Sequence, residues 1–493
     1  MVHYLDLLSD TFQKNWEKPA LTDYAVLDGG AGNDYSYGEL YRKIEWLRKV
    51  FTKAGLLPGD HIAVCGVNSA NWAVAYLAIA SYQGVSVTIL NSQNPEIIVQ
   101  QVTFADSKAL FVDSDIWEQL PDNLPLDYVF SLEDFSVLKG VLIDVPDNVF
   151  GPEDVRFVTG DINCLAQICF TSGSTDEPKG VMLSYGNISN NVLVGIEICP
   201  ISNYENAVSI LPLSHTFGLV FELLVHLEHA DRVFLLGKHF SFGIMLESFQ
   251  RVQPRILQTV PMMMEQLYCR FGKNMANVFG QNLYHLFVGG SSLRPELEDT
   301  LLLLGIPLTV GYGSTETAPL IASSNLELYL PHSVGQVVSG MEARISDNGE
   351  ILVRGKNVML GYYKNPEATR RKIDADGWLH TGDRGWIDKN NNVFVYGRLE
   401  QDMIVLPSGE NIIPQNIEAL LNKIDGVEES LVLERSGRLI ALVYQRTASM
   451  DKSTLLRTVN LQLPPFSQLA DIEFVSEPFQ RTGKSDIKRY LYS

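Results

Sequence analysis

The stretch Thr171-Ser-Gly-Ser-Thr-Asp-Glu-Pro-Lys-Gly180 follows a short apolar run, 165–170, that is typical of a buried strand. Backbone N–H groups and hydroxyls in such a turn can surround the oxygens of a polyphosphate, its glycines allow close backbone approach, and Lys179 supplies positive charge. The stretch is not the Walker motif, in which the lysine follows the glycine, because Lys179 precedes Gly180. A solvated surface loop has the same composition, so both interpretations stay open from these residues alone.

The order of these residues resembles the phosphate loop of the adenylate-forming superfamily, which includes acyl- and aryl-CoA synthetases, peptide-synthetase adenylation domains and luciferases. The resemblance implies that the loop binds ATP and that its first residue lies near magnesium. The residues so implicated are Thr171, Ser172, Gly173, Ser174, Thr175, Lys179 and Gly180. Asp176 stands where the family has glycine. Since its carboxylate would repel a triphosphate, we expect it to face solvent or to pair with a base.

Composition narrows the class of protein. The chain has 493 residues, which indicates about two or three domains. Its formal net charge of −20 argues against nucleic acid as a main partner and disfavours electrostatic docking on anionic lipid. Five cysteines without a Cys-x-x-Cys pair disfavour a disulfide framework and a zinc site, so we expect a reducing, cytoplasmic location. The N-terminal residues lack the pattern of a signal peptide, and nothing predicts the oligomeric state.

One uncharged stretch, Trp72–Leu90, is long enough to span a bilayer. Its interruption by Ser-Tyr-Gln-Gly at 81–84 predicts instead a buried helix that ends near Tyr82 and is followed by a strand, Val85–Leu90. We therefore expect no transmembrane segment.

Alternating strands and helices predict an α/β fold with parallel sheets. Strands are expected at 61–66 and 85–90, and then at 207–211, 233–236, 255–260, 283–288 and 308–311. Short strands from about residue 334 predict a small antiparallel subdomain, and the last region has a βαββαβ-like pattern. We predict a large domain of parallel and mixed sheets, residues 1–398, and a small α+β domain, residues 399–493. The resemblance implies that the small domain is mobile and that the large one holds ATP and the acid.

Polar residues at Gly311-Tyr-Gly-Ser-Thr-Glu316 come at the end of a predicted strand. Tyr312 could stack on a purine, Thr315 could bond a phosphate oxygen and Glu316 could hold magnesium. A strand-end turn whose polar groups bond their own backbone would explain them equally well. The segment resembles the family motif Gly-Tyr-Gly-x-Thr-Glu, to which those three roles belong. The resemblance places Gly311, Tyr312, Gly313, Ser314 and Thr315 at the ATP site, with Thr315 among the catalytic residues.

Three further motifs gain meaning only from the resemblance. Thr381-Gly-Asp383 and Tyr396-Gly-Arg398 alone are ordinary turn sequences, but they are similar to the family's ribose-binding segments, which implicates Asp383 and Arg398. Pro212-Leu-Ser-His215 is similar to a family segment whose histidine lies near the acyl carboxylate, which makes His215 a catalytic and acyl-pocket candidate.

The acyl pocket itself is predicted from small and apolar residues. Gly289 and Gly290, which the resemblance also places at the ATP site, leave room beside the carboxylate. Phe217, Phe221 and 262–264, three methionines, are expected to form apolar walls, which favours a medium to long aliphatic chain.

Gln480-Arg-Thr-Gly-Lys484 lies near the C-terminus, where a lysine is usually solvated. The segment resembles the family's closing motif, whose lysine bridges the carboxylate and the α-phosphate and offsets developing charge there. The resemblance places Gly409 at the thiol tunnel. The spacing from Arg398 to Gly409 is slightly longer than in the family. The hinge carboxylate could therefore be Glu400 or Asp402.

The resemblance is strongest to AMP-forming acyl-CoA synthetases of the long-chain type, on segments such as Val288-Gly-Gly-Ser-Ser-Leu293 and Gly361-Tyr-Tyr-x-Asn-Pro366. It implies that ATP, magnesium and coenzyme A serve as cofactors: the acid and ATP give acyl-AMP and pyrophosphate, and the thiol of coenzyme A then displaces AMP. Three alternatives remain: the pantetheine of an acyl carrier protein as acceptor, a luciferase-type oxygenase, and a non-catalytic nucleotide or acyl-AMP binder.

Overall fold

The structure is a computed structural model that describes residues 2–121, 123–146, 149–171, 179–199, 205–398, 404–405, 411–412, 414–435, 438–445, 450–464, 467–481, 487 and 489–492. The chain forms two compact units. Unit 1 comprises Met1–Arg344, Leu352–His380 and Ile387–Phe394, and unit 2 comprises Ile345–Ile351, Thr381–Trp386 and Val395–Ser493. The predicted domain boundary after residue 398 stays a prediction.

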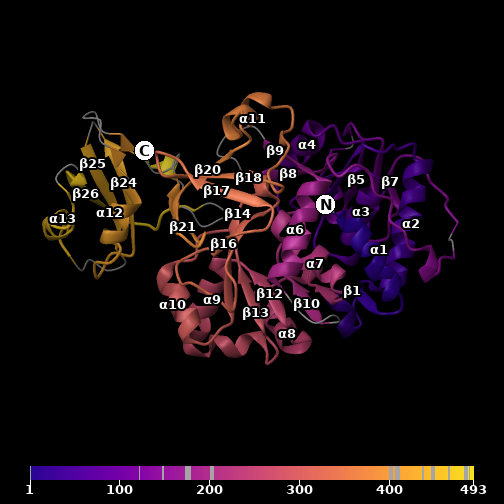
Figure 1. Cartoon of the computed structure of the whole chain (residues 1–493), viewed down its shortest axis with the longest axis horizontal. Coiled ribbons are helices and arrows are strands. Elements are labelled where there is room, and N and C mark those ends of the chain that lie inside the picture. The colour runs from indigo at the N-terminus through magenta and orange to yellow at the C-terminus, as the bar shows by residue number, and fades with distance from the viewer. Residues whose placement is uncertain are drawn as a thin grey trace. The chain divides into compact units, whose positions relative to one another are not determined.

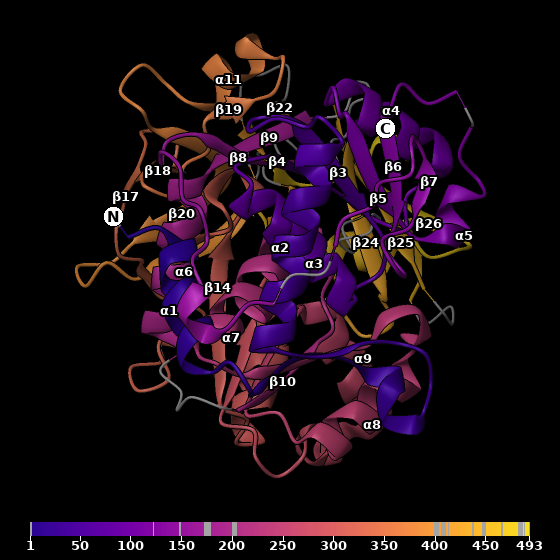
Figure 2. The ribbon, with the colours of Figure 1, turned by 90° about the vertical axis from the view of Figure 1, so that its right-hand side faces the viewer.

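Unit 1 contains an eight-stranded sheet in the order β19-β9-β8-β4-β3-β5-β6-β7. Its strands are β3 (His61–Cys65), β4 (Val85–Ile89), β5 (Ala109–Val112), β6 (Tyr128–Ser131), β7 (Val137–Lys139), β8 (Leu165–Thr171), β9 (Lys179–Ser184) and β19 (Gly361–Tyr362). The central pairs are parallel, as the βαβ pattern predicts, whereas β8 and β9 form an antiparallel pair on either side of the phosphate loop. Helices α2 (Tyr37–Lys53) and α3 (Ala70–Ser81) lie side by side (Figure 2), and α4 (Pro95–Phe104) and α5 (Ser114–Trp117) follow in the chain.

Helix α3 confirms the prediction of a buried helix and strand in place of a membrane span. The side chain of Ser69 accepts a hydrogen bond from the amide of Trp72 and so caps the helix at its start. Every residue of α3 is buried, because the helix contacts strands of both large sheets of unit 1. Within the described part of the chain, no helix is long and apolar enough to cross a membrane.

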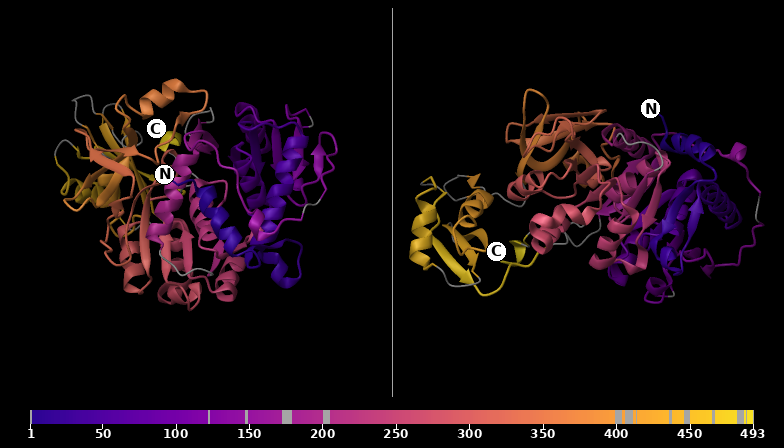
Figure 3. Two further views of the ribbon diagram at one scale, coloured as in Figure 1. Left: turned by 45° about the vertical axis from the view of Figure 1, so that its right-hand side comes forward. Right: turned by 90° about the horizontal axis from the view of Figure 1, so that it is seen from below.

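The second sheet of unit 1 has nine strands in the order β16-β15-β14-β13-β12-β10-β11-β1-β2. They are β1 (Pro19–Asp23), β2 (Asp34–Ser36), β10 (Asn206–Ser209), β11 (Arg232–Leu235), β12 (Ile256–Thr259), β13 (His285–Val288), β14 (Leu308–Gly313), β15 (Leu320–Ser323) and β16 (Gln336–Val337). Pairs from β1 and β11 through to β13 and β14 are parallel, and the outer pairs are antiparallel. In Figure 3 the strands β3 to β7 of the first sheet are indigo to purple, and the strands β10 to β14 of the second sheet are magenta to salmon.

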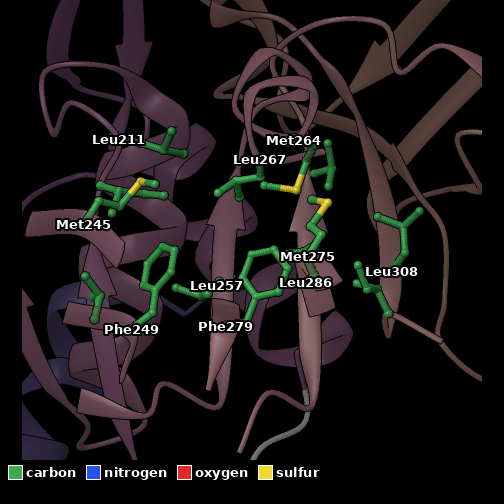
Figure 4. Close-up of a cluster of buried hydrophobic side chains, with 14 of the residues drawn as sticks. Leu211, Met245, Phe249, Leu257, Met264, Leu267, Met275, Phe279, Leu286 and Leu308 are labelled. Carbon is green, nitrogen blue, oxygen red and sulfur yellow. The ribbon is translucent and has the colours of Figure 1, made fainter. Parts of the chain in front are cut away.

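The other helices of unit 1 up to residue 303 are α1 (Tyr4–Lys14), α6 (Tyr185–Ile198), α7 (Val225–Glu228), α8 (Phe242–Val252), α9 (Pro261–Phe271) and α10 (Pro295–Leu303). Figure 1 shows α8, α9 and α10 beside β12 and β13. Leu257, Leu286 and Leu308 occupy matching positions on β12, β13 and β14, so their side chains share one face of the sheet. Figure 4 shows these leucines packed with Met264 from α9 and Phe249 from α8. Burial of each large apolar side chain stabilises the fold by about 1.5–3 kcal/mol, which fixes the strand ends above this core.

Four of the strands that follow β16 form a separate, smaller sheet. β17 (Met341–Ile345), β18 (Glu350–Gly355), β20 (Leu379–Ile387) and β21 (Val393–Arg398) form a four-stranded sheet in the order β17-β18-β20-β21, and α11 (Pro366–Lys372) precedes β20. The described remainder of unit 2 contains β22 (Ile404–Val405), β23 (Asn411–Ile412), α12 (Pro414–Leu421), β24 (Glu429–Arg435), β25 (Arg438–Tyr444), α13 (Lys452–Asn460) and β26 (Asp471–Val475). Strands and helices therefore follow the predicted βαββαβ-like order.

Candidate active site

The parallel strands β13 and β14 end at one edge of the nine-stranded sheet, and glycines occupy both ends. A Cβ on Gly313 would lie 1.8 Å from the carbonyl oxygen of Pro319, so no other residue fits without a backbone shift. A Cβ on Gly311 would lie 2.5 Å from the ring of Phe287. Close packing at the strand end therefore requires both glycines of the Gly-Tyr-Gly segment. Gly311 and Gly313 belong to β14 itself, which runs two residues beyond the predicted strand.

Glu316 lies in the turn that follows β14. The hydroxyl of Tyr362 donates to its Oε1 over 2.9 Å, and the amide of Met359 donates to its backbone carbonyl over 2.9 Å. Burial raises the pKa of the Glu316 carboxyl, but the Lys372 ammonium and hydrogen bonds from Tyr362 and Ser314 outweigh it and hold that pKa below its usual value. The carboxylate is therefore ionised at neutral pH, as a magnesium ligand must be.

Tyr362 also connects Glu316 with the phosphate loop. It lies on β19, where it pairs with Val181 of β9, the strand that begins at Lys179. Thr171 pairs with Lys179 across the antiparallel β8–β9 ladder, so the first and last parts of the loop are held opposite each other. Two segments far apart in sequence, the end of the phosphate loop and the Glu316 turn, are thus brought together by one tyrosine.

Three buried asparagines on α6 support the same turn. The side chain of Asn191 donates to the carbonyl of Thr317 over 3.3 Å and accepts from the amide of Leu320 over 3.0 Å. Asn190 donates to the side chain of Asn357 over 2.7 Å, which in turn donates to the carbonyl of Leu320. Asn187 donates to the carbonyls of residues 356 and 358. Sequence reasoning missed this network, although asparagines at positions i, i+3 and i+4 of an apolar helix are a signal that could have indicated it.

His215 follows β10 in the Leu211–His215 segment, and its side chain is half-buried. Phe217 comes next and packs edge-on against Phe221 and Phe287, with ring centroids 5.7 and 5.6 Å apart. A Cβ on Gly289 would lie 3.2 Å from the Phe217 ring, so this aromatic cluster contacts the glycine edge directly. Phe221 has no exposed surface and packs against Phe217 from within the core. Met264 is a core residue, whereas Met262 is 38% exposed.

In unit 2, the Thr381–Asp383 turn is fixed by its own hydrogen bonds. The amide of Asp383 donates to the hydroxyl of Thr381 over 3.0 Å, and that hydroxyl donates to the carbonyl of Ile351. The amide of Gly382, whose φ of 78° favours glycine, donates to the carboxylate of Glu350 over 2.9 Å. The Asp383 side chain is therefore held on a defined turn.

Several predicted site residues lie outside the described residues, so their roles stay predictions. They are Ser172, Gly173, Ser174, Thr175, Asp176, Glu400, Asp402, Gly409 and Lys484, together with the side chains of Thr171 and Arg398. Among the residues that are described, no three His, Cys, Asp or Glu side chains are grouped to hold a metal ion. A single carboxylate such as that of Glu316 is enough for magnesium, which typically binds one or two carboxylates and takes its remaining ligands from phosphates and water.

Comparisons with known proteins identify the family of the chain. A family model described as AMP-binding enzyme matches residues 8–363. The chain is similar to the long-chain-fatty-acid–CoA ligase ACSBG2 of Mus musculus, with 23% identity over 94% of this chain and 80% of that protein. It is also similar to 4-coumarate–CoA ligase 3 of Arabidopsis thaliana, with 26% identity over 96% and 89% of the two chains. The fold matches that of ATP-bound MatB from Rhodopseudomonas palustris with a TM-score of 0.81 and 24% identity, over 99% of this chain and 98% of that one. Because the family model spans well over half of the sequence, the chain belongs to the AMP-binding enzyme family.

Proposed function

We propose that this protein is an AMP-forming ligase that activates a carboxylic acid with ATP and transfers the acyl group to the thiol of coenzyme A. Membership of the AMP-binding enzyme family and similarity to several CoA ligases support the reaction class. The observation that carries the proposal is the ionised Glu316 carboxylate, which Tyr362 holds next to the strand that leaves the phosphate loop.

The residues have distinct roles in this reaction. Lys179 and the amide of Gly180 contact phosphate oxygens, and Tyr312 stacks on adenine. Asp383 binds the ribose. When it is bound, magnesium supplies charge neutralisation at the phosphates, and Glu316 would hold it.

Two displacements make up the reaction. An oxygen of the acid attacks the α-phosphorus, the bond to the β-phosphate breaks, and pyrophosphate leaves. The sulfur of coenzyme A then attacks the acyl carbon, the bond to AMP breaks, and the thiol proton passes to solvent. Lys484 stabilises the charge that develops in the first step only.

The acid is proposed to be a medium to long aliphatic one. The aromatic cluster of Phe217, Phe221 and Phe287 gives the glycine edge an apolar wall. The named substrates of the relatives, a long-chain fatty acid and 4-coumarate, are both carboxylic acids with large apolar parts. Buried thiols at Cys65, Cys169 and Cys199 fit a reducing compartment, so we propose a cytoplasmic location.

The test is pyrophosphate release from Mg-ATP with a panel of octanoate, dodecanoate, hexadecanoate and 4-coumarate, followed by mass spectrometry of the product with coenzyme A. We expect acid-dependent release and an acyl-CoA, highest for one of the aliphatic acids. Acid-dependent release with transfer only to a phosphopantetheinylated carrier protein would favour the carrier-protein alternative. ATP binding without release for any acid would contradict the proposal and favour a non-catalytic binder.

A further inference from the structure

The chain leaves the nine-stranded sheet after Ser209, the last residue of β10. Beyond this strand end, the backbone of the Leu211–His215 segment needs other hydrogen-bond partners. Glu222, which is 1% exposed, provides them from one side. Its carboxyl group accepts from the amide of Ile210 over 3.2 Å and from the amide of Leu211 over 3.0 Å. The hydroxyl of Ser209 bonds the same group over 2.9 Å. One buried side chain thus fixes the first residues of the segment.

Asn68 holds the segment from the side of the other sheet. Its amide nitrogen donates to the carbonyl of Leu211 over 2.7 Å and to the hydroxyl of Ser209, and its oxygen accepts from the amide of Leu213 over 2.9 Å. Thr88, on β4, donates to the carbonyl of Ser214 over 3.0 Å. Backbone groups of every residue from 210 to 214 except Pro212 are therefore held by side chains from elsewhere in the fold, directly before His215.

The loop that carries Asn68 is itself fixed between the two sheets. The amide of Val67 donates to Asp113 at the end of β5 over 2.9 Å, and the amide of Ala70 donates to Asp23 at the end of β1 over 2.8 Å. The position of Asn68 is therefore set by Asp113 and Asp23, independently of the Leu211–His215 segment that it holds.

Glu222 is an expensive residue to bury, because removing a carboxyl group from water destabilises its ionised form. That burial raises the pKa of Glu222 to about 8, even though three groups donate hydrogen bonds to it. It also lies in a wide π-helical segment, Gly218–Leu224, and such segments are frequent at functional sites. A plain strand end does not require either feature.

We propose that Glu222 and Asn68 are positioning residues that hold His215 against the carboxylate of the acid substrate. This inference rests on the proposed function, in which His215 lies at the acyl carboxylate. Neither residue touches the reacting atoms. Their loss should weaken the binding of the acid and leave the binding of ATP intact, because the Glu316 turn is held by a separate set of side chains on α6.

The experiment compares Glu222→Ala, Glu222→Gln and Asn68→Ala with the unchanged protein, using the acid that turns over fastest in the panel of octanoate, dodecanoate, hexadecanoate and 4-coumarate. Asp231→Asn is the matched control. Asp231 is a fully buried carboxylate just after α7, the helix that continues from the Gly218–Leu224 segment. It bonds His226 over 2.8 Å and the amide of Glu205 over 2.8 Å, and neither partner belongs to the Leu211–His215 segment.

We expect Glu222→Ala and Asn68→Ala to raise KM for the acid about tenfold, the size expected for losing one or two hydrogen bonds, while KM for ATP changes less than about twofold. In Glu222→Gln the amide oxygen can still accept from the backbone amides of Ile210 and Leu211, and the NH2 group can donate to the Ser209 hydroxyl, so KM for the acid should stay within about twofold of the unchanged protein. Asp231→Asn should lower the midpoint of thermal unfolding without changing KM for the acid. Since Asn68 is half-buried, Asn68→Ala decides the question even where Glu222→Ala does not fold.

The inference is overturned where both alanine variants leave KM for the acid unchanged, where they raise KM for ATP equally, or where Asp231→Asn raises KM for the acid as much. His215→Ala separates this failure from that of the proposed function. A raised KM for the acid in His215→Ala, with none in Glu222→Ala or Asn68→Ala, refutes only the positioning role. An unchanged KM for the acid in His215→Ala refutes the role of His215 in the proposed function, and the positioning role with it.

Discussion

The hydrogen bond from Tyr362 to Glu316 offers a sharp test of the proposed magnesium site. Tyr362→Phe removes only the hydroxyl oxygen, because the ring stays buried and the backbone still pairs with Val181 on β9. The lost interaction is a 2.9 Å hydrogen bond to an ionised, half-buried carboxylate. Such bonds contribute about 1.5 kcal/mol at the low end of their range, which corresponds to about tenfold in affinity. Loss of a group that orients a metal ligand typically costs 10–100-fold in metal affinity or activity, so the two estimates agree.

The measurement is the initial rate of pyrophosphate release as magnesium is titrated at fixed ATP and acid. We expect the magnesium concentration for half-maximal rate to rise about tenfold in Tyr362→Phe, with KM for the acid unchanged. Tyr363→Phe is the matched control, because that neighbouring hydroxyl donates to Asp106 over 2.8 Å, in the exposed part of the structure. Equal magnesium dependence in Tyr362→Phe and the unchanged protein would refute the role of the Tyr362–Glu316 hydrogen bond in magnesium binding. An equal shift in Tyr363→Phe would refute the assignment of the effect to this one bond.

Three further outcomes are expected. Gly313→Ala should destabilise the protein by about 3 kcal/mol or prevent folding, because its Cβ would lie 1.8 Å from the Pro319 carbonyl oxygen, whereas Gly243→Ala, with only a contact at 3.9 Å, should not lower the thermal midpoint. Burial raises the pKa of the Glu222 carboxyl to about 8 in the folded state, so the folded protein binds more protons than the unfolded chain between about pH 4.5 and 8. The free energy of unfolding should therefore fall with rising pH in this range, by up to about 1.4 kcal/mol per pH unit. Glu222→Gln should flatten that slope in thermal melts, and an equal slope in both proteins would contradict the raised pKa. Lys484→Ala should cut acyl-AMP formation about 100-fold or more and spare thioester formation from supplied acyl-AMP; equal losses in both half-reactions would contradict a role confined to the first.

Much of the fold follows from the sequence because its signals are local. The strands expected at 61–66 and 85–90 match β3 and β4 to within one residue, since each is a short apolar run bounded by turn residues. The uncharged stretch after residue 72 divides into a helix and a strand at the predicted polar interruption. The order of elements near the C-terminus is likewise set by local periodicity.

The supporting groups of the site could not be predicted, because they depend on pairings between distant segments. Tyr362 reaches Glu316 only because the two-residue strand β19 pairs with β9. Glu222 lies in an apolar stretch whose spacing predicts an ordinary helix. Periodicity does not reveal that this stretch forms a π-helix, or that the Glu222 carboxyl group accepts a hydrogen bond from the backbone just after β10. The roles of the phosphate-loop residues 172–178 and of Lys484 come from resemblance alone and stay predictions.

The complete burial of α3 has a consequence for how the chain is made. A helix without a solvent-facing side cannot be sheltered by one sheet alone, so the early part of the chain has no stable resting state during synthesis. Strand β1 increases this dependence, because its parallel partner β11 lies at 232–235 and emerges from the ribosome much later, so only the edge of β1 that faces β2 can pair early. Until then, nascent chains expose both an apolar helix and an unpaired strand edge, the two features that chaperones recognise and that promote aggregation. The two sheets of unit 1 should consequently form in a single cooperative event, and truncation between them should yield an insoluble product and not a smaller working enzyme.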